Sequence, residues 1–174
     1  MQNLDSIDQT ILSLLQSDGN LSAAEVAEKV NLSQSPCWRR IARLQEEGYI
    51  KKKVILLDRQ KLGLHSVVFV NIKLSAHGRK MLSEFEEAVV GFPEVVECWT
   101  ITGGVDYSLR IVTKDIQSYE QFLRKHLLKL PHILEAQSHV GITEVKHTTE
   151  LPINVSWVIV VQIFNSKALF ETYI

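Results

Sequence analysis

The chain has few cysteines and no sign of an exported protein. Its two cysteines, Cys37 and Cys98, lie far apart and form no CxxC pair among the 174 residues. This spacing favours neither a disulfide framework nor a zinc finger. The first residues also lack the basic and apolar regions of a secretory signal. We therefore expect a reduced, cytoplasmic protein.

Long hydrophobic runs and an excess of one charge are also missing. The longest apolar run, residues 155–164, is interrupted by Ser156 and Gln162. It falls short of the ~20 residues that span a bilayer, so we expect no membrane partner. The formal net charge is −1. A surface that binds nucleic acid would therefore have to arise from local segregation of charge.

The short motifs of common catalytic and metal sites do not occur. The six histidines show neither HExxH nor zinc-finger spacing, and there is no GxSxG, P-loop or GxGxxG segment. We expect no catalytic residue, no metal and no cofactor. Both cysteines are interpreted as small buried side chains rather than redox thiols.

Three short helices are predicted in the first fifty residues. An apolar stripe at helical spacing over residues 4–15 predicts the first, and residues 18–20 would end it. Ser22 stands three residues before Glu25, which is the spacing of a capping box at the start of a second helix. Three helices with a short turn before the third form a helix-turn-helix arrangement.

The third helix is predicted to have a cationic face. It can begin at Ser33 or Ser35, because Pro36 is acceptable in a first helical turn. One side is apolar, and the arginines lie on the other side. Residues 38–53 contain six basic residues against two acidic ones, so the basicity missing from the whole chain is present here. A helix of this kind can enter a major groove.

These basic residues support two interpretations. They could form an ordinary solvated face, or they could contact phosphates and bases. No acidic residue precedes Glu46 on the helix, which favours DNA contact. Trp38 could alter base preference or only cover the helix flank. The candidate DNA-binding residues are Ser33, Gln34, Ser35, Trp38, Arg39, Arg40, Arg43, Lys51, Lys52 and Lys53.

The rest of the chain alternates strand and helix patterns. Alternation with period two predicts strands, and apolar positions at helical spacing predict helices. The predicted elements are strand 68–74, helix 81–89, strands 95–102 and 107–113, helix 116–130 and strand 133–145. This order is the ferredoxin-like βαββαβ plan. Because two helices would cover only one face of the sheet, we expect a homodimer that packs the other faces together.

The expected fold class is α+β. A helix-turn-helix domain (winged-helix-like) would occupy residues 1–50, a hinge strand or linker residues 51–64, and the ferredoxin-like dimerisation and effector-binding domain residues 65–153. Residues 154–174 form a β-prone apolar tail, which is an aggregation hazard if exposed. The tail could add a strand at an oligomer interface, or it could have no function.

Residues 32–50 carry a specific resemblance. Their sequence, LSQSPCWRRIARLQEEGYI, resembles the signature LS-x-x-PC-x-x-R-x-x-x-L-x-x-x-G-x-I of the leucine-responsive/asparagine-synthetase-regulator (Lrp/AsnC, feast/famine) family. Leu4, Asp5 and Asp8 resemble the opening helix of that family, and the similarity runs over residues 3–153. The resemblance implies a nucleoid-associated transcription regulator that binds double-stranded DNA as a dimer, tetramer or octamer. It also implies that residues 50–58 are a hinge strand that pairs across the dimer.

The turn after the second predicted strand resembles the family's G-x-x-D-Y segment, which lines an effector pocket between subunits. Glycines let a ligand approach backbone amides, and a carboxylate can pair with an α-ammonium group. The alternative is a plain hairpin in which the aspartate accepts from turn amides. The resemblance implies an amino-acid effector, with cysteine or a branched-chain amino acid as candidates. The candidate effector-binding residues are Gly103, Gly104, Asp106, Tyr107, Ser138 and Thr143.

A competing hypothesis is a ferredoxin-like small-molecule sensor or metabolic enzyme with a helical protein-interaction domain. The ferredoxin-like plan alone cannot decide, because it hosts many unrelated activities. The order of the modules, with the helix-turn-helix first, resembles the regulator family. We therefore expect a regulator of amino-acid metabolism genes and no enzyme activity.

Overall fold

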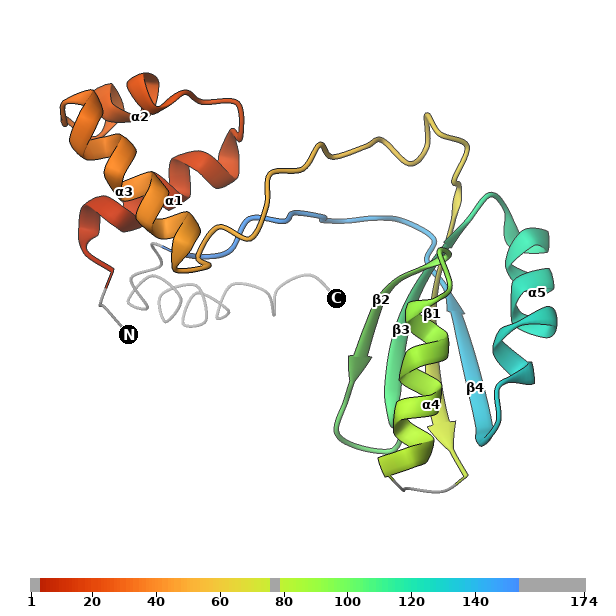
Figure 1. Ribbon diagram of the computed structural model, residues 1–174. Helices are drawn as coiled ribbons and strands as arrows, with labels where there is room; N and C mark the ends of the chain where they lie inside the picture. The colour runs from red at the N-terminus through yellow and green to blue at the C-terminus, as the bar shows by residue number, and fades with distance from the viewer. Residues whose placement is uncertain (1–3, 76–78, 154–174) are drawn as a thin grey trace, which may run out of the picture. The chain divides into compact units, whose positions relative to one another are not determined.

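The computed structural model describes residues 4–75 and 79–153 (Figure 1). They form two compact units, a helical unit of residues 4–55 and 147–153 and a sheet unit of residues 56–146. Each unit has its own hydrophobic core. No helix within the described ranges is long and apolar enough to cross a bilayer. The predicted apolar tail lies outside the described residues.

The helical unit contains the three helices that the sequence predicts. They are α1 (Ser6–Ser17), α2 (Ala23–Lys29) and α3 (Gln34–Glu46). The N-cap of α3 is Ser33, which decides between the two starts that the sequence left open. The helix-turn-helix prediction is confirmed.

Two of these helices begin with a capping box. At α1 the Asp5 carboxylate accepts from the backbone N–H of Asp8, at 2.7 Å, and the Asp8 carboxylate accepts from the N–H of Asp5, at 3.4 Å. At α2 the same exchange joins Ser22 and Glu25, as the sequence predicts. Such caps satisfy N–H groups that a helix leaves unbonded, and each is worth roughly 1 kcal/mol.

Residues 147–153 return to the helical unit. The side-chain amide of Gln16 donates to the carbonyl oxygen of Leu151 and accepts from its N–H, both at 2.9 Å. Ile153 packs against the helical core. Local sequence patterns place residues 147–153 with the sheet domain instead, because a contact across 135 positions leaves no periodic signal in the sequence.

The sheet unit has a four-stranded antiparallel sheet. Its strands are β1 (Ser66–Leu74), β2 (Val95–Thr100), β3 (Tyr107–Thr113) and β4 (Ile133–Val140). Their spatial order is β2-β3-β1-β4, so β1 pairs with both β3 and β4. This topology confirms the ferredoxin-like plan.

Two helices cover one face of the sheet. They are α4 (Arg79–Val90) and α5 (Ile116–Lys125), and α4 lies in front of the sheet in Figure 1. Alternate residues of β1 are buried, and they join Phe85 of α4 and Phe122 of α5 in one core. The opposite face carries exposed apolar side chains, including Phe69, which is 44% exposed. The sequence expectation of one covered and one open face is confirmed.

Several predicted boundaries are wrong. β2 ends at Thr100 rather than 102, and β4 ends at Val140 rather than 145. The helix predicted over residues 116–130 divides into α5 and a 3-10 turn, Leu127–Lys129. β4 ends early because its partner strand β1 begins only at Ser66. The last hydrogen bond between the two segments is donated by the N–H of Gly141 to the carbonyl oxygen of Val67. Residues 51–57 form no strand in this single chain.

Candidate nucleic-acid interface and effector loop

The N-terminal part of α3 is open to solvent. Trp38 is 61% exposed. Within the described residues, the Arg39 side chain has no ion pair or hydrogen bond. The other polar candidates at this helix start, all exposed, are Ser33, Gln34 and Ser35. The structure therefore presents a polar, cationic surface at the beginning of α3.

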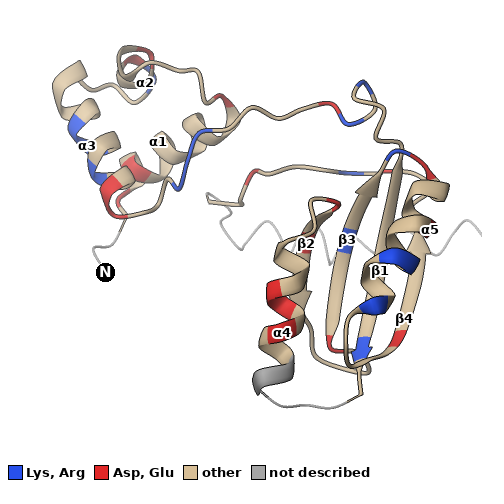
Figure 2. Ribbon diagram, turned by 45° about the vertical axis from the view of Figure 1, so that its right-hand side comes forward, with Lys and Arg blue, Asp and Glu red and all other residues tan. Residues whose placement is uncertain are grey.

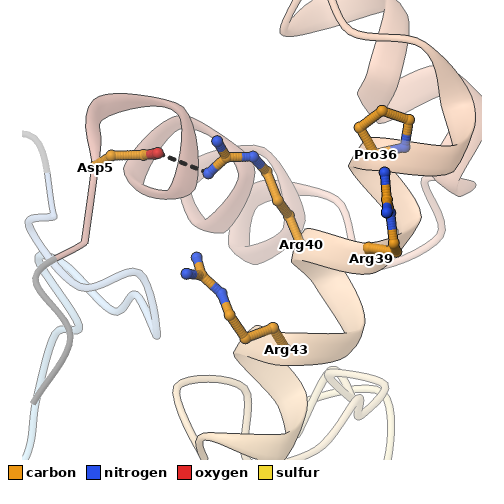
Figure 3. A pocket seen from close by; sticks show the side chains of 5 residues that line it. All are labelled: Asp5, Pro36, Arg39, Arg40 and Arg43. Atoms are coloured by element: carbon orange, nitrogen blue, oxygen red, sulfur yellow. Dashed lines mark hydrogen bonds and ion pairs between the residues drawn. The ribbon is translucent and has the colours of Figure 1, made fainter.

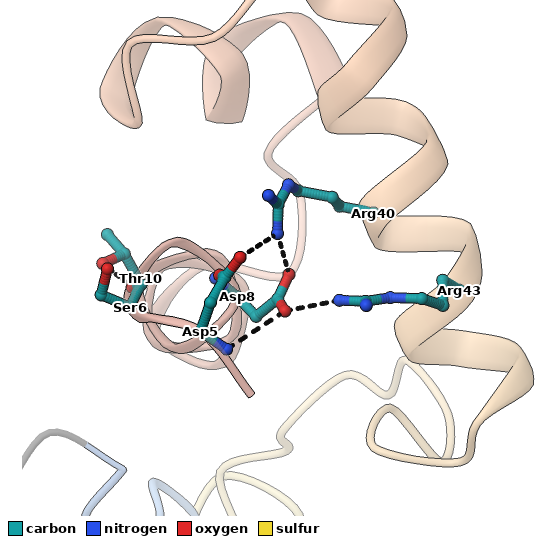
Figure 4. A network of polar contacts seen from close by, with 6 residues as sticks. All are labelled: Asp5, Ser6, Asp8, Thr10, Arg40 and Arg43. Atoms are coloured by element: carbon teal, nitrogen blue, oxygen red, sulfur yellow. Dashed lines mark hydrogen bonds and ion pairs between the residues drawn. The ribbon is translucent and has the colours of Figure 1, made fainter. Parts of the chain in front are cut away.

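Arg40 and Arg43 behave differently from Arg39, because both reach across to α1 (Figure 4). Arg40 Nη1 donates to Asp5 Oδ2 at 2.7 Å and to Asp8 Oδ1 at 2.8 Å. Arg43 Nη2 donates to Asp8 Oδ2 at 2.5 Å. Figure 2 shows the basic residues of α3 beside the acidic start of α1. Two of the three candidate arginines thus also hold α3 against α1.

Asp8 is the central residue of this network, and sequence reasoning did not single it out as a functional residue. Its side chain is 2% exposed, and both of its carboxylate oxygens accept from arginine. A buried carboxylate is costly unless it is paired and hydrogen-bonded, and here both conditions are met. The available signal was the spacing of Asp5 and Asp8, which is the spacing of a capping box.

The network reduces the charge that α3 presents to an approaching anion. Asp5, Asp8, Arg40 and Arg43 carry two negative and two positive charges. The N–H of Asp8 and the guanidinium of Arg40 lower the pKa of the Asp5 carboxyl, so this group is ionised at neutral pH. Hydrogen bonds from Arg40 to Asp5 and Asp8 raise the pKa of Arg40. Arg39 is thus the α3 arginine that these carboxylates do not neutralise.

A cavity of about 410 Å³ lies beside this network. It is lined by Asp5, Pro36, Arg39, Arg40 and Arg43. In Figure 3 the Arg40 guanidinium points to Asp5, whereas Arg39 extends along Pro36. Guanidinium groups bind carboxylates and phosphates by the same N–H geometry, so the cavity has the chemistry of an anion site.

The lysine run follows α3 directly. Lys51, Lys52 and Lys53 are exposed and belong to the helical unit. They lie outside the helices and form no strand. Flexible, exposed ammonium groups suit phosphate contacts rather than base readout.

The loop between β2 and β3 holds the predicted effector residues. Gly103 has φ +119, a conformation that favours glycine, and Gly104 is exposed. The Asp106 carboxylate accepts from the N–H of Leu74 at 2.7 Å, and the Asp106 N–H donates to the carbonyl of Ile72 at 2.8 Å. Asp106 therefore ties the loop to the end of β1, and the amide that its carboxylate accepts from belongs to β1 rather than to the β2–β3 turn that the hairpin alternative named.

Two other predicted effector residues have partners inside the sheet unit. The Tyr107 side chain is buried, and its hydroxyl donates to Glu86 of α4 at 2.8 Å. Burial and the neighbouring carboxylate raise the pKa of that hydroxyl. The hydroxyls of Ser138 and Tyr119 are hydrogen-bonded to each other. These contacts join the two helices to the sheet.

Thr143 lies away from the Gly103–Asp106 loop within one chain. The loop precedes β3, and the N-terminal residue of β3, Tyr107, pairs near the C-terminal end of β1. Thr143 follows Val140, which pairs near the N-terminal end of β1. The structure therefore places these candidates toward opposite ends of the sheet, and one chain does not bring them together.

Cys98 corrects one sequence interpretation. It is exposed, because β2 is an edge strand, whereas Cys37 is buried in the helical core as predicted. Although the residue is exposed, partial desolvation of its sulfur and the nearby Glu86 carboxylate raise the pKa of the Cys98 thiol, which lowers its thiolate fraction. Among the described side chains, no three of His, Cys, Asp or Glu are grouped to hold a metal ion.

Comparison with known proteins assigns a class to each unit. Residues 4–51 match the description "Winged helix-turn-helix DNA-binding", and residues 67–151 match "Lrp/AsnC ligand binding domain". The chain is 38% identical to the DNA-binding transcriptional activator DecR of Escherichia coli over 150 residues, which are 86% of this chain and 99% of DecR. These matches define a DNA-binding transcription regulator, and they do not support the enzyme alternative.

Solved structures of regulators of this kind are similar to this chain over most of its length. The chain is similar to an AsnC family transcriptional regulator from Agrobacterium tumefaciens, with 42% identity, a TM-score of 0.82 and coverage of 86% of this chain and 97% of that one. It is also similar to a transcriptional regulator from Neisseria meningitidis in complex with L-Met, with 34% identity, a TM-score of 0.84 and coverage of 87% and 98%. The chain belongs to the Lrp/AsnC family of transcription regulators.

Proposed function

We propose that this regulator binds operator DNA as a homodimer through the start of α3 and that an amino acid bound in the sheet unit changes that binding. The main support for this DNA-binding surface is the exposed start of α3, where Arg39 is unpaired among the described residues. We place its action on the nucleoid in the cytoplasm, at genes of amino-acid metabolism. Higher assembly into tetramers or octamers is part of the same proposal.

The candidate residues divide by exposure into two roles. Trp38 and Arg39, with Ser33, Gln34 and Ser35, contact bases or the adjoining phosphates from the exposed start of α3. The lysines of 51–53 add phosphate contacts beyond the helix. Arg40 and Arg43 are held by the α1 carboxylates and contact DNA phosphates rather than base edges. A guanidinium has five N–H groups, so one that is bonded to a carboxylate can also contact a phosphate.

Arg39→Ala tests the proposed interface. If Arg39 binds a base edge, we expect a loss of about 1–3 kcal/mol that is confined to one operator position. If it binds a phosphate, the loss is similar for every sequence, and the salt slope of log K falls by about 0.9 per subunit. Fluorescence anisotropy with labelled duplexes over a KCl series separates the two. Arg124→Ala, on the exposed face of α5, is the matched control. If wild type and Arg39→Ala bind DNA with equal affinity, the start of α3 is not the DNA interface.

The open face of the sheet supports the homodimer. Phe69 on β1 and Trp99 on β2 are 44% and 65% exposed there. Arg110 and Glu97 on this face form an ion pair of 2.6 Å, and Lys73 of β1 lies opposite Glu135 of β4, so charges of opposite sign are neighbours. A face with exposed aromatic side chains and charges matched in this way can pack against a second copy of itself related by a two-fold axis. Residues 50–58 would pair as hinge strands in such a dimer.

The Gly103–Asp106 loop supports the effector proposal. Gly103 and Gly104 are exposed, so an α-carboxylate can approach their backbone N–H groups, and the same loop carries the Asp106 carboxylate, which accepts from Leu74. The similar Neisseria meningitidis regulator was solved with L-Met, which is also an α-amino acid. Because Thr143 follows the other end of the sheet, a site with both Gly104 and Thr143 requires more than one subunit. Cysteine and the branched-chain amino acids are the candidates to compare with methionine.

A thermal-shift screen against the common amino acids tests the effector. A ligand at ~100 times its dissociation constant stabilises the folded state by about 2.7 kcal/mol, so a selective rise in melting temperature is expected. The rise should be lost in Gly104→Val, which blocks close approach to the backbone at an exposed loop position. Gly19→Val is a comparable exposed glycine substitution in the helical unit, and it should keep the rise. A rise that Gly104→Val retains would place the ligand elsewhere.

A further inference from the structure

Asp5 and Asp8 bind the same arginine from different environments. Arg40 Nη1 lies 2.7 Å from Asp5 and 2.8 Å from Asp8. The Asp8 side chain is 2% exposed, whereas the Asp5 side chain is 49% exposed and lines the 410 Å³ cavity. An incoming anion can therefore reach the Asp5 side of Arg40 and cannot reach the Asp8 side.

The cavity offers an anion two different guanidinium groups. Arg39 is exposed and has no described partner, while Arg40 is already bonded to Asp5 on the accessible side. A phosphate and a carboxylate bind guanidinium N–H groups in the same plane and at similar distances. A phosphate that contacts Arg39 and Arg40 together must therefore displace Asp5 from Arg40 or accept its repulsion.

We propose that the cavity bounded by Asp5 and the α3 arginines is a binding site for a DNA phosphate and that Asp5 competes with this phosphate for Arg40. Asp5 is then a positioning residue that lowers affinity for DNA of any sequence. This inference rests on the proposed α3 interface. Binding would depend more on the base contacts from the exposed start of α3, because the phosphate contribution is reduced.

The size of the effect follows from the charge alone. A carboxylate about 6 Å from a phosphate in water costs the complex roughly a three-fold loss in affinity, and two subunits give roughly ten-fold. Without the Asp5 charge, one more guanidinium per subunit can neutralise a phosphate, and DNA then releases one more counterion. The slope of log K against log salt concentration therefore becomes steeper by about 0.9 per subunit. A purely structural role for Asp5 would change neither quantity.

Asp5→Asn removes the charge and keeps the helix cap. Asparagine is as good an N-cap residue as aspartate, and the amide oxygen can still accept from the N–H of Asp8. Asp115→Asn is the matched control. Asp115 is the N-cap of α5 in the sheet unit, its carboxylate accepts from Ser118 at 2.7 Å, and it does not line the cavity. Both variants change the net charge of the chain equally.

The experiment measures the affinity of the full chain for a short duplex of arbitrary sequence over a KCl series. The expected result is that Asp5→Asn binds roughly ten-fold tighter with a steeper salt slope, while Asp115→Asn binds as wild type does. Equal gains in both variants would overturn the competition, because general charge would explain them. Wild-type affinity and slope for Asp5→Asn, with weakened binding by Arg39→Ala, would overturn the competition and leave the α3 interface standing. If Arg39→Ala also binds as wild type, the α3 interface fails and the phosphate site fails with it.

Discussion

Asp8→Ala is expected to destabilise the helical unit by about 2–3 kcal/mol, below the ~3–5 kcal/mol for breaking a fully buried ion pair. The variant removes the carboxylate on which Arg40 and Arg43 converge, as well as half of the α1 capping box. The loss is smaller than for a fully buried pair because the arginine side chains are 29% and 36% exposed and can be hydrated again. Hydrogen exchange of the α1 and α3 amides, read by mass spectrometry, should accelerate by about 30- to 150-fold.

Asp18→Ala is the control for this prediction. Asp18 lies at the other end of α1, is exposed, and its carboxylate accepts from the N–H of Asn20 at 2.9 Å. Its loss should cost less than about 1 kcal/mol, as is usual for a single exposed hydrogen bond. Similar exchange rates in the Asp8→Ala and Asp18→Ala variants would show that the Asp8 network contributes little to stability.

Phe69→Asp is expected to weaken dimerisation by at least about 100-fold, because an unpaired carboxylate would be buried in the interface. Phe69 lies on the central strand β1 and on the face that the helices leave uncovered. Sedimentation equilibrium should show wild-type dimers or larger assemblies and a Phe69→Asp monomer. Operator binding should weaken with it, since two linked half-site contacts become one.

Leu128→Asp provides the matched substitution for this second prediction. Leu128 is 49% exposed on the 3-10 turn after α5, so it has nearly the same exposure as Phe69 but does not belong to the sheet. It should sediment as wild type does. If Phe69→Asp remains dimeric, the open sheet face is not the dimer interface.

Local patterns determined most of the secondary structure. Ser22 and Glu25 are three residues apart, so one helical turn brings them together and their capping box could be predicted directly. The alternation of apolar and polar residues along β1 likewise predicted its buried and open faces, because successive side chains of a strand point to opposite sides. Residues 32–50 likewise carried enough of the family signature to indicate a regulator before any contact was known.

The ends of elements depended on neighbours that the sequence does not display. The residues after Val140 have a suitable strand composition, yet β4 stops there because β1 offers no further partner. Strand length is a property of a pair, whereas periodicity is a property of one segment. A hinge strand over residues 50–58 likewise needs a second strand, which a single chain does not supply.

The sequence by itself determined the kind of protein, its two units and the helix that carries the DNA-binding candidates. Only the tertiary structure decided that Arg40 and Arg43 are held by Asp8, 32 and 35 positions away, while Arg39 is not. It also decided that Gln16 binds Leu151 across 135 positions. Helical periodicity acts over three or four residues, so it shows which side of a helix is polar. Which charge pairs with which depends on how the helices pack, and packing follows from the whole buried core.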